Sequence, residues 1–193
     1  MVEIYKLEFT ILQQEILRFL FLMAGKSFNA YNLSKYLDVS QTAVAKALPY
    51  IEKKGIIKIS KDKESKRWSI ELNRENKHVL NLKRAENLRV VYESRLVEFL
   101  SEKFPSSTLI LFGSYSFGED TFNSDIDIAI IGAKEKNIDL SEFNKKLKRI
   151  VSINFYKNFK EINKNLRENI FNGIILKGGI ELWKSSENFS TKA

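Results

Sequence analysis

Two aspartates separated by one isoleucine are the residues of this chain with the clearest capacity for chemistry. Asp125 and Asp127 alternate with Ile126, Ile128 and Ile130. This period of two predicts a strand with both carboxylates on one face, roughly 6.6 Å apart along it, and with the isoleucines turned into the core. Neighbouring carboxylates repel each other, and a divalent cation such as Mg²⁺ relieves that repulsion. The pair is therefore a candidate metal site.

Ten residues separate a glycine and a serine from this pair. The apolar run from Leu109 to Phe112 predicts a buried strand that ends at Gly113 and Ser114, where a small residue lets the backbone approach a ligand closely. Backbone amides and the Ser114 hydroxyl would face phosphate while the aspartates face metal. Each motif alone has a plainer explanation, since a Gly-Ser pair is a common turn and an Asp-x-Asp pair is common on a solvated strand face. Together they predict a site for Mg²⁺ and a nucleoside triphosphate.

The combined pattern resembles the signature of the DNA polymerase beta-like nucleotidyltransferase superfamily, especially its small "minimal" members. That signature reads hydrophobic-Gly-Ser, a spacer, then Asp-hydrophobic-Asp-hydrophobic, and Ser124 before the first aspartate also matches. The resemblance implies transfer of a nucleoside monophosphate from an NTP, with ATP as the expected one, to a hydroxyl acceptor. It assigns Gly113, Ser114 and Ser124 to nucleotide binding, and Asp125 and Asp127 to Mg²⁺ binding and catalysis.

The chain departs from this family pattern at two places. Active members carry a third carboxylate on the next strand, where it helps bind the metal that activates the attacking hydroxyl and accepts its proton. The corresponding strand here offers only Ser152, the favoured position, and Asn154, so the third catalytic carboxylate is not found. Asp139 or Glu161 could replace it only if a loop folds inward. Phe117 stands where many minimal members have an arginine.

The residues before this site predict a second module. Apolar residues recur at helical spacing, and two short strands surround a Lys-rich turn. The expected elements are helices over 12–23, 30–37 and 41–53 and strands over 56–60 and 67–72. This order resembles a winged helix-turn-helix domain, in which the third helix enters the major groove of DNA and the wing contacts the DNA backbone.

By this resemblance, the groove-facing candidates are Gln41, Thr42 and Lys46. The candidates on the wing are Lys58, Lys61, Lys63, Lys66 and Arg67. These residues predict nucleic-acid binding, with DNA favoured over RNA. The alternative is a dimerisation or RNA-docking module in which the lysines form only a solvated surface.

The whole chain is expected to be α+β. We expect an N-terminal winged helix domain at 1–72 and a linking helix at 73–103, either continuous or broken near Asn81 or Asn87, that packs on the second domain. A small polymerase-beta-like nucleotidyltransferase α/β domain with a mixed sheet is expected at 104–184, and a polar tail at 185–193. The net charge of +8 favours a polyanionic partner. The lack of cysteine excludes a disulfide scaffold and fits a cytoplasmic location. Neither a signal peptide nor a membrane span is predicted.

These patterns leave alternative functions open. The leading one is a nucleotidyltransferase that binds Mg-NTP, is targeted by a DNA-binding winged helix, and modifies a hydroxyl on nucleic acid or protein. The alternative is a DNA-binding transcriptional regulator whose nucleotidyltransferase fold has lost catalysis and senses nucleotide or forms a homodimer. The resemblance adds an antitoxin-type protein that modifies a partner toxin protein. A carboxylate brought to the third strand from elsewhere would favour the enzyme, and a bare Ser152/Asn154 face the regulator.

Overall fold

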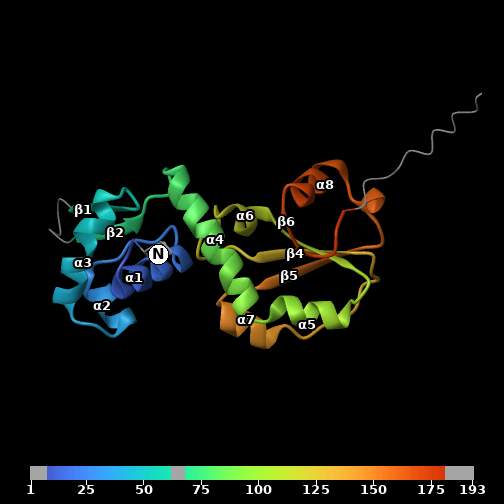
Figure 1. Ribbon diagram of the computed structural model, residues 1–193, viewed down its shortest axis with the longest axis horizontal. Coiled ribbons are helices and arrows are strands. Elements are labelled where there is room, and N and C mark those ends of the chain that lie inside the picture. Colours follow the sequence, from blue (N-terminus) through green and yellow to red (C-terminus); the bar gives the residue numbers. More distant parts are fainter. Residues whose placement is uncertain (1–7, 62–67, 181–193) are drawn as a thin grey trace, which may run out of the picture.

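The computed structural model describes residues 8–61 and 68–180, and it is α+β, as predicted. Figure 1 shows two modules with a long helix, α4 (Lys77–Glu93), between them. Within the described residues, no helix has both the length and the apolarity needed to cross a membrane.

The N-terminal module is a three-helix unit with a two-stranded wing. Its elements are α1 (Ile11–Leu22), α2 (Ala30–Leu37), α3 (Gln41–Lys53), β1 (Ile57–Lys61) and β2 (Trp68–Leu72). The strands pair antiparallel. Ser40 caps α3, its hydroxyl accepting a hydrogen bond of 3.1 Å from the amide of Ala43. Fully buried aliphatic side chains from all three helices form one core, so the predicted winged helix is the observed fold.

Two helices connect the modules over the predicted linking segment 73–103, and the break between them lies at Arg95 and not near Asn81 or Asn87. After α4, residue Arg95 takes the left-handed conformation with φ of 68°, and α5 (Leu96–Lys103) starts in a new direction. Val79, near the start of α4, belongs to the core of the N-terminal module, whereas Val91, near its end, belongs to the core of the second module. Helix α4 is therefore shared by both.

The second module is built on a mixed four-stranded sheet in the order β5-β4-β3-β6. Strand β4 pairs parallel with β5 and antiparallel with β3, which in turn pairs antiparallel with β6. The elements are β3 (Thr108–Phe112), α6 (Gly113–Phe117), β4 (Ile126–Ile131), α7 (Ser141–Leu147), β5 (Val151–Tyr156), the 3-10 helix η1 (Phe159–Glu161), α8 (Lys164–Phe171) and β6 (Ile174–Lys177).

The two faces of this sheet carry different side chains. One face packs Ile126, Ile128 and Ile130 against α5 and α7, so the predicted inward isoleucines are confirmed. The other face packs Ala129 and Ile131 with residues around α8. Because alternate residues share a face, Asp127 lies on this second face, toward the end of the sheet where β4 and β5 begin.

Candidate functional site

The glycine turn and the aspartate pair meet in the structure as the sequence predicted. Strand β3 pairs with β4 so that Phe112 is opposite Asp127, which places Gly113 beside the aspartate. Gly113 has φ of 72°, and a Cβ built on it would lie 2.9 Å from Oδ2 of Asp127. Both the backbone conformation and the space require glycine at this position. The carboxylate thus lies directly against the start of α6.

The electrostatics of the pair fit a bound cation. Asp127 is half-buried and Asp125 is exposed. Burial, followed by the negative charge of Asp125, raises the pKa of Asp127 above its ordinary value. A divalent cation would offset both effects, and carboxylate oxygens are ligands that Mg²⁺ prefers. The two aspartates therefore suit a metal that also binds the oxygens of a substrate.

The two serines of the motif differ in their settings. Ser114 is half-buried in the first turn of α6, where backbone N–H groups lack partners within the helix. Ser124 closes a turn: its Oγ accepts a hydrogen bond of 2.9 Å from the amide of Thr121, and its own amide donates to the Thr121 carbonyl at 3.0 Å. This turn holds Asp125 in a fixed relation to the residues that precede it.

The third strand supplies no carboxylate to the site. In the parallel pairing of β4 with β5, Ser152 is the partner of Asp127, and Asn154 is the partner of Ala129. Neighbouring strands lie roughly 4.8 Å apart, so the Ser152 side chain is beside Asp127 on the same face. This confirms Ser152 as the position next to the pair. Among the described residues, no group of three or more His, Cys, Asp or Glu side chains could hold a metal.

The two loop carboxylates considered as substitutes lie elsewhere. Asp139 accepts a hydrogen bond of 2.9 Å from the amide of Ser141, and it is exposed before α7. Glu161 follows the far end of β5 and accepts from the amide of Lys157 at 3.4 Å. Neither of them completes the site.

A cleft of about 380 Å³ opens beside Asp125. One wall is the segment from Phe122 to Asp125, and the other includes Lys148 and Arg149, just before β5. Arg149 is largely buried, and its Nε has no hydrogen-bond partner in the part of the chain that the structure describes. Sequence reasoning missed these two cations, although a basic pair directly before the third strand was visible.

A buried ionic cluster supports the loop that leads to Asp125. Asp120 is 1% exposed and forms an ion pair with the fully buried Lys83 of α4. Nδ2 of Asn87 also donates to Oδ1 of Asp120, at 2.7 Å. Burial lowers the pKa of Lys83, and the charge of Asp120 opposes that shift. Nearby, Gly118 packs so closely on α4 that a Cβ there would lie 2.2 Å from the Leu80 carbonyl oxygen.

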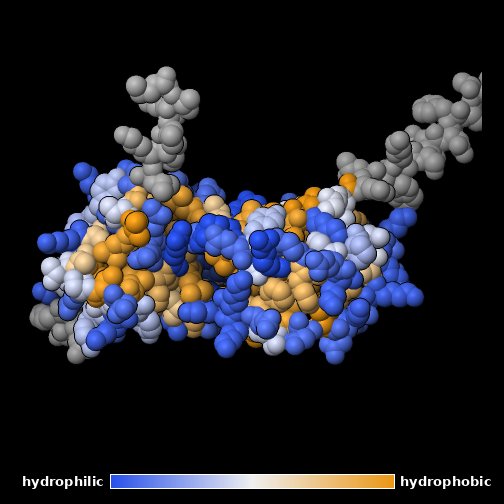
Figure 2. All heavy atoms as spheres, turned by 60° about the horizontal axis from the view of Figure 1, so that its bottom comes forward, coloured by the Kyte–Doolittle hydropathy of each residue, from blue (hydrophilic) through white to orange (hydrophobic). Residues whose placement is uncertain are grey.

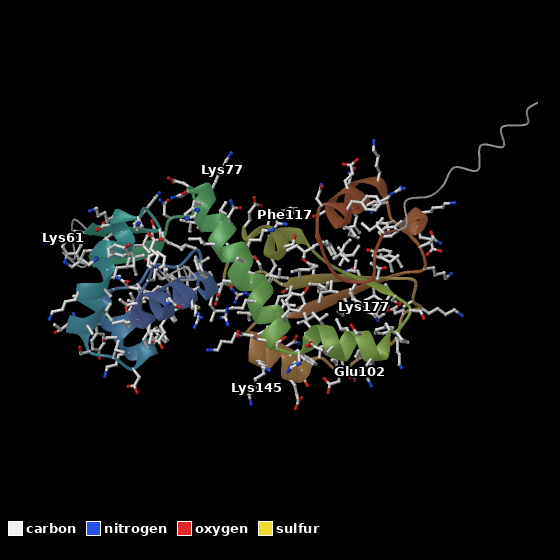
Figure 3. The ribbon with its side chains drawn as sticks, viewed as in Figure 1. Lys61, Lys77, Glu102, Phe117, Lys145 and Lys177 are labelled. Atoms are coloured by element: carbon white, nitrogen blue, oxygen red, sulfur yellow. The ribbon has the colours of Figure 1, made fainter. Side chains whose placement is uncertain are left out.

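Most of the DNA-binding candidates in the described residues are exposed. Gln41, Thr42 and Lys46 lie on the outer face of α3. Lys61 lies at the outer end of the N-terminal module (Figure 3), with its Nζ 5.7 Å from the centroid of the Trp68 ring. Half-buried Lys58 forms an ion pair of 2.7 Å with Glu75 and is less free to contact phosphate. Lys63, Lys66 and Arg67 lie outside the described residues.

Phe117, the other departure from the family pattern, is half-buried beside α4. Figure 3 labels Phe117 near α4. Its ring centroid is 6.0 Å from the guanidinium carbon of Arg84.

Comparison with known proteins supports a nucleotidyltransferase-type second module. Residues 93–176 match the model of the nucleotidyltransferase domain family. The match runs from the last residue of α4 into β6 and includes the glycine turn and both aspartates. A search of curated proteins gives no match.

Several solved structures show weak similarity. Two are crystal structures of the adhesin competence repressor AdcR from Streptococcus pyogenes. One is 22% identical, covers 50% of this chain and 69% of AdcR, and has a TM-score of 0.39. The other is 21% identical, covers 53% and 71%, and has a TM-score of 0.40. A cysteine-to-serine mutant of ZitR from Lactococcus lactis is 19% identical, covers 53% and 67%, and has a TM-score of 0.40.

Proposed function

We propose that this protein binds a Mg²⁺–nucleoside triphosphate at Asp125 and Asp127 and transfers a nucleoside monophosphate to a hydroxyl acceptor. The observation that carries this proposal is the Asp127 carboxylate lying against Gly113, within the segment that matches the nucleotidyltransferase domain family. ATP is the expected NTP. The winged helix module would bind DNA and so bring the nucleotide site close to it.

The residues present divide the work between them. Asp125 and Asp127 would hold the metal, which when bound supplies positive charge to the triphosphate and to the charge that develops during transfer. Gly113 lets the backbone come close to phosphate because it has no side chain. The hydroxyl of Ser114 would donate to a phosphate oxygen, while Ser124 would fix the loop and line the cleft.

The cleft beside Asp125 is the expected place for the acceptor. Its basic wall, Lys148 and Arg149, faces a wall that ends in a carboxylate. Such a cleft suits an acceptor that carries negative charge next to its hydroxyl, as nucleic acid does. A hydroxyl of a protein remains an alternative acceptor, and the test below includes both.

One observation favours a second candidate function, a DNA-binding regulator that binds nucleotide without transferring it. Ser152 occupies the position beside Asp127 where a general base would stand. Loss of a positioned general base lowers rates by about 10² to 10⁴. In that case the Mg²⁺–NTP complex would act as a signal, and the winged helix would provide the output.

The experiment that separates these candidates follows a label from NTP to acceptor. The full chain is incubated with each NTP labelled at the α-phosphate, with Mg²⁺, and with DNA, total RNA or cell protein in turn. Transferred label that disappears in Asp125→Asn with Asp127→Asn, and persists in Asp139→Asn, supports the transferase. Nucleotide binding without transfer supports the regulator, and absence of both rejects the site assignment.

A further inference from the structure

We propose that the winged helix module positions Asp125. The module is then part of the nucleotide site and does not serve only to bring that site to DNA. The contact runs from the end of α1 to the loop 119–124, with Lys26 as the main positioning side chain. The role assigned to Asp125 rests on the proposed function, whereas the contact itself does not.

The residues that follow α1 hold this loop directly. The amide of Phe122 donates a hydrogen bond of 3.0 Å to the carbonyl of Ala24. The Nζ of Lys26 lies 3.8 Å from the centroid of the Phe122 ring, a cation–π distance. Between them, Gly25 has φ of 89°, and a Cβ there would be 3.5 Å from Cγ2 of Thr121. The loop therefore packs on this turn through both backbone and side chain.

The opposite wall of the cleft is attached to the same helix. The Arg149 guanidinium donates to the carbonyl of Leu22, the last residue of α1. The same group lies 3.9 Å from Oδ2 of Asp120, inside the loop. Both walls of the cleft beside Asp125 are thus fixed to residues 22–26. A displacement of α1 would change the shape of the cleft.

The remaining anchors of the loop also come from the first half of the chain. The Arg74 guanidinium donates a hydrogen bond of 3.0 Å to the Glu119 carbonyl. Asp120 is held by Lys83 and Asn87 of α4, which lies between the modules (Figure 1). In the face shown by Figure 2, hydrophilic side chains gather in the middle of the molecule, between apolar areas on either side. A polar junction is expected where charged groups of two modules meet.

The turn from Thr121 to Ser124 transmits this anchoring to Asp125. Its two reciprocal hydrogen bonds join Thr121 to Ser124, so they enclose Phe122 and end at the residue directly before Asp125. Because the module that holds Phe122 also carries the DNA-binding candidates on α3, the two binding events share one structural element. Any change that DNA imposes on α1 would alter nucleotide affinity, and nucleotide would alter DNA affinity by the same factor.

The test uses the full chain and three variants, each measured without DNA. Lys26→Ala removes the cation above Phe122, Lys26→Arg keeps a cation there, and Lys53→Ala removes an exposed lysine at the end of α3 as a control. The first measurement is hydrogen exchange of the amides from Thr121 to Ile126. The second is the Kd for Mg²⁺–ATP.

We expect faster exchange and a Kd about two- to fivefold higher in Lys26→Ala, the effect of one partly exposed cation–π contact. Lys26→Arg should restore both values, and Lys53→Ala should match the wild type. Unchanged exchange in Lys26→Ala overturns the proposal. Faster exchange with an unaltered Kd overturns the link to Asp125.

If the wild type does not bind Mg²⁺–ATP, the proposed function fails, and the exchange measurement alone decides whether Lys26 positions the loop.

Discussion

An alanine at position 113 would put a methyl group where the Asp127 carboxylate lies. The added Cβ would be 2.9 Å from Oδ2 of Asp127, so the carboxylate must move. Gly113 also has φ of 72°, a conformation that costs an L-residue about 1–2 kcal/mol. Gly113→Ala should therefore destabilise the fold by about that amount. It should also weaken Mg²⁺-dependent nucleotide binding by about 10- to 100-fold, the usual effect of displacing a metal ligand through its support.

Gly132 provides the matched control for this substitution. It follows β4 with φ of 94°, but a Cβ there would lie 3.7 Å from its nearest neighbour, the Ser106 carbonyl oxygen. Gly132→Ala should carry a similar backbone cost and leave the site unaltered. Urea unfolding gives the free energy of unfolding of each variant, and calorimetry gives its affinity for Mg²⁺–ATP. Equal losses of affinity in both variants, or wild-type affinity in Gly113→Ala, would refute the assignment of Gly113 to the site.

Ser152→Asp should raise Mg²⁺-dependent transfer by up to about 10²–10⁴-fold. Asn154→Asp should not, because Asn154 lies two residues farther along β5 from the position opposite Asp127. Slower transfer by Ser152→Asp than by the wild type would show that another residue already acts as the base. Because the pKa of Asp127 is raised above the ordinary 3.8, first by burial and then by the neighbouring carboxylate, its protonated form stabilises the fold below pH 3.8, and that stability is lost as pH rises through the folded pKa. Without Mg²⁺, Asp127→Asn should thus have a higher free energy of unfolding in urea than the wild type at pH 7, and the difference should shrink toward pH 3.8. A difference that stays the same at both pH values would contradict the raised pKa of Asp127. Lys61→Ala should reduce the slope of log K for duplex DNA against log salt by about 0.9. Lys58→Ala should reduce it by less, because the Lys58 ammonium is already paired with Glu75. Equal slopes in the wild type and both variants would argue against contacts between the wing and DNA.

The parts of the site that the sequence predicted depend on local patterns. The alternation around Asp127 determined which face its carboxylate occupies, and the structure confirms that face. The glycine turn was predictable because Gly113 directly ends an apolar run. Ser152 was predictable as the neighbour of Asp127 once the third strand was placed, since strand alternation allows few positions. These inferences needed only short segments and their order.

The missed features depend on contacts between distant segments. The sequence analysis did not single out Lys83 or Arg149, because lysine and arginine are almost never fully buried unless paired. Their partner, Asp120, lies far from both in the sequence, so no local pattern indicated the burial. The end of α4 was also missed, because Arg95 adopts a left-handed conformation that usually calls for glycine. Such positions are determined by tertiary packing.

The most direct test of the central claim is a calorimetric titration of ATP into the full chain, with and without Mg²⁺. The protein carrying both Asp125→Asn and Asp127→Asn is titrated alongside, with Asp139→Asn as the control for loss of an exposed carboxylate. The proposed site predicts binding that requires Mg²⁺, is abolished in the double variant and is preserved in the control. Equal ATP binding by the wild type and the double variant would contradict it.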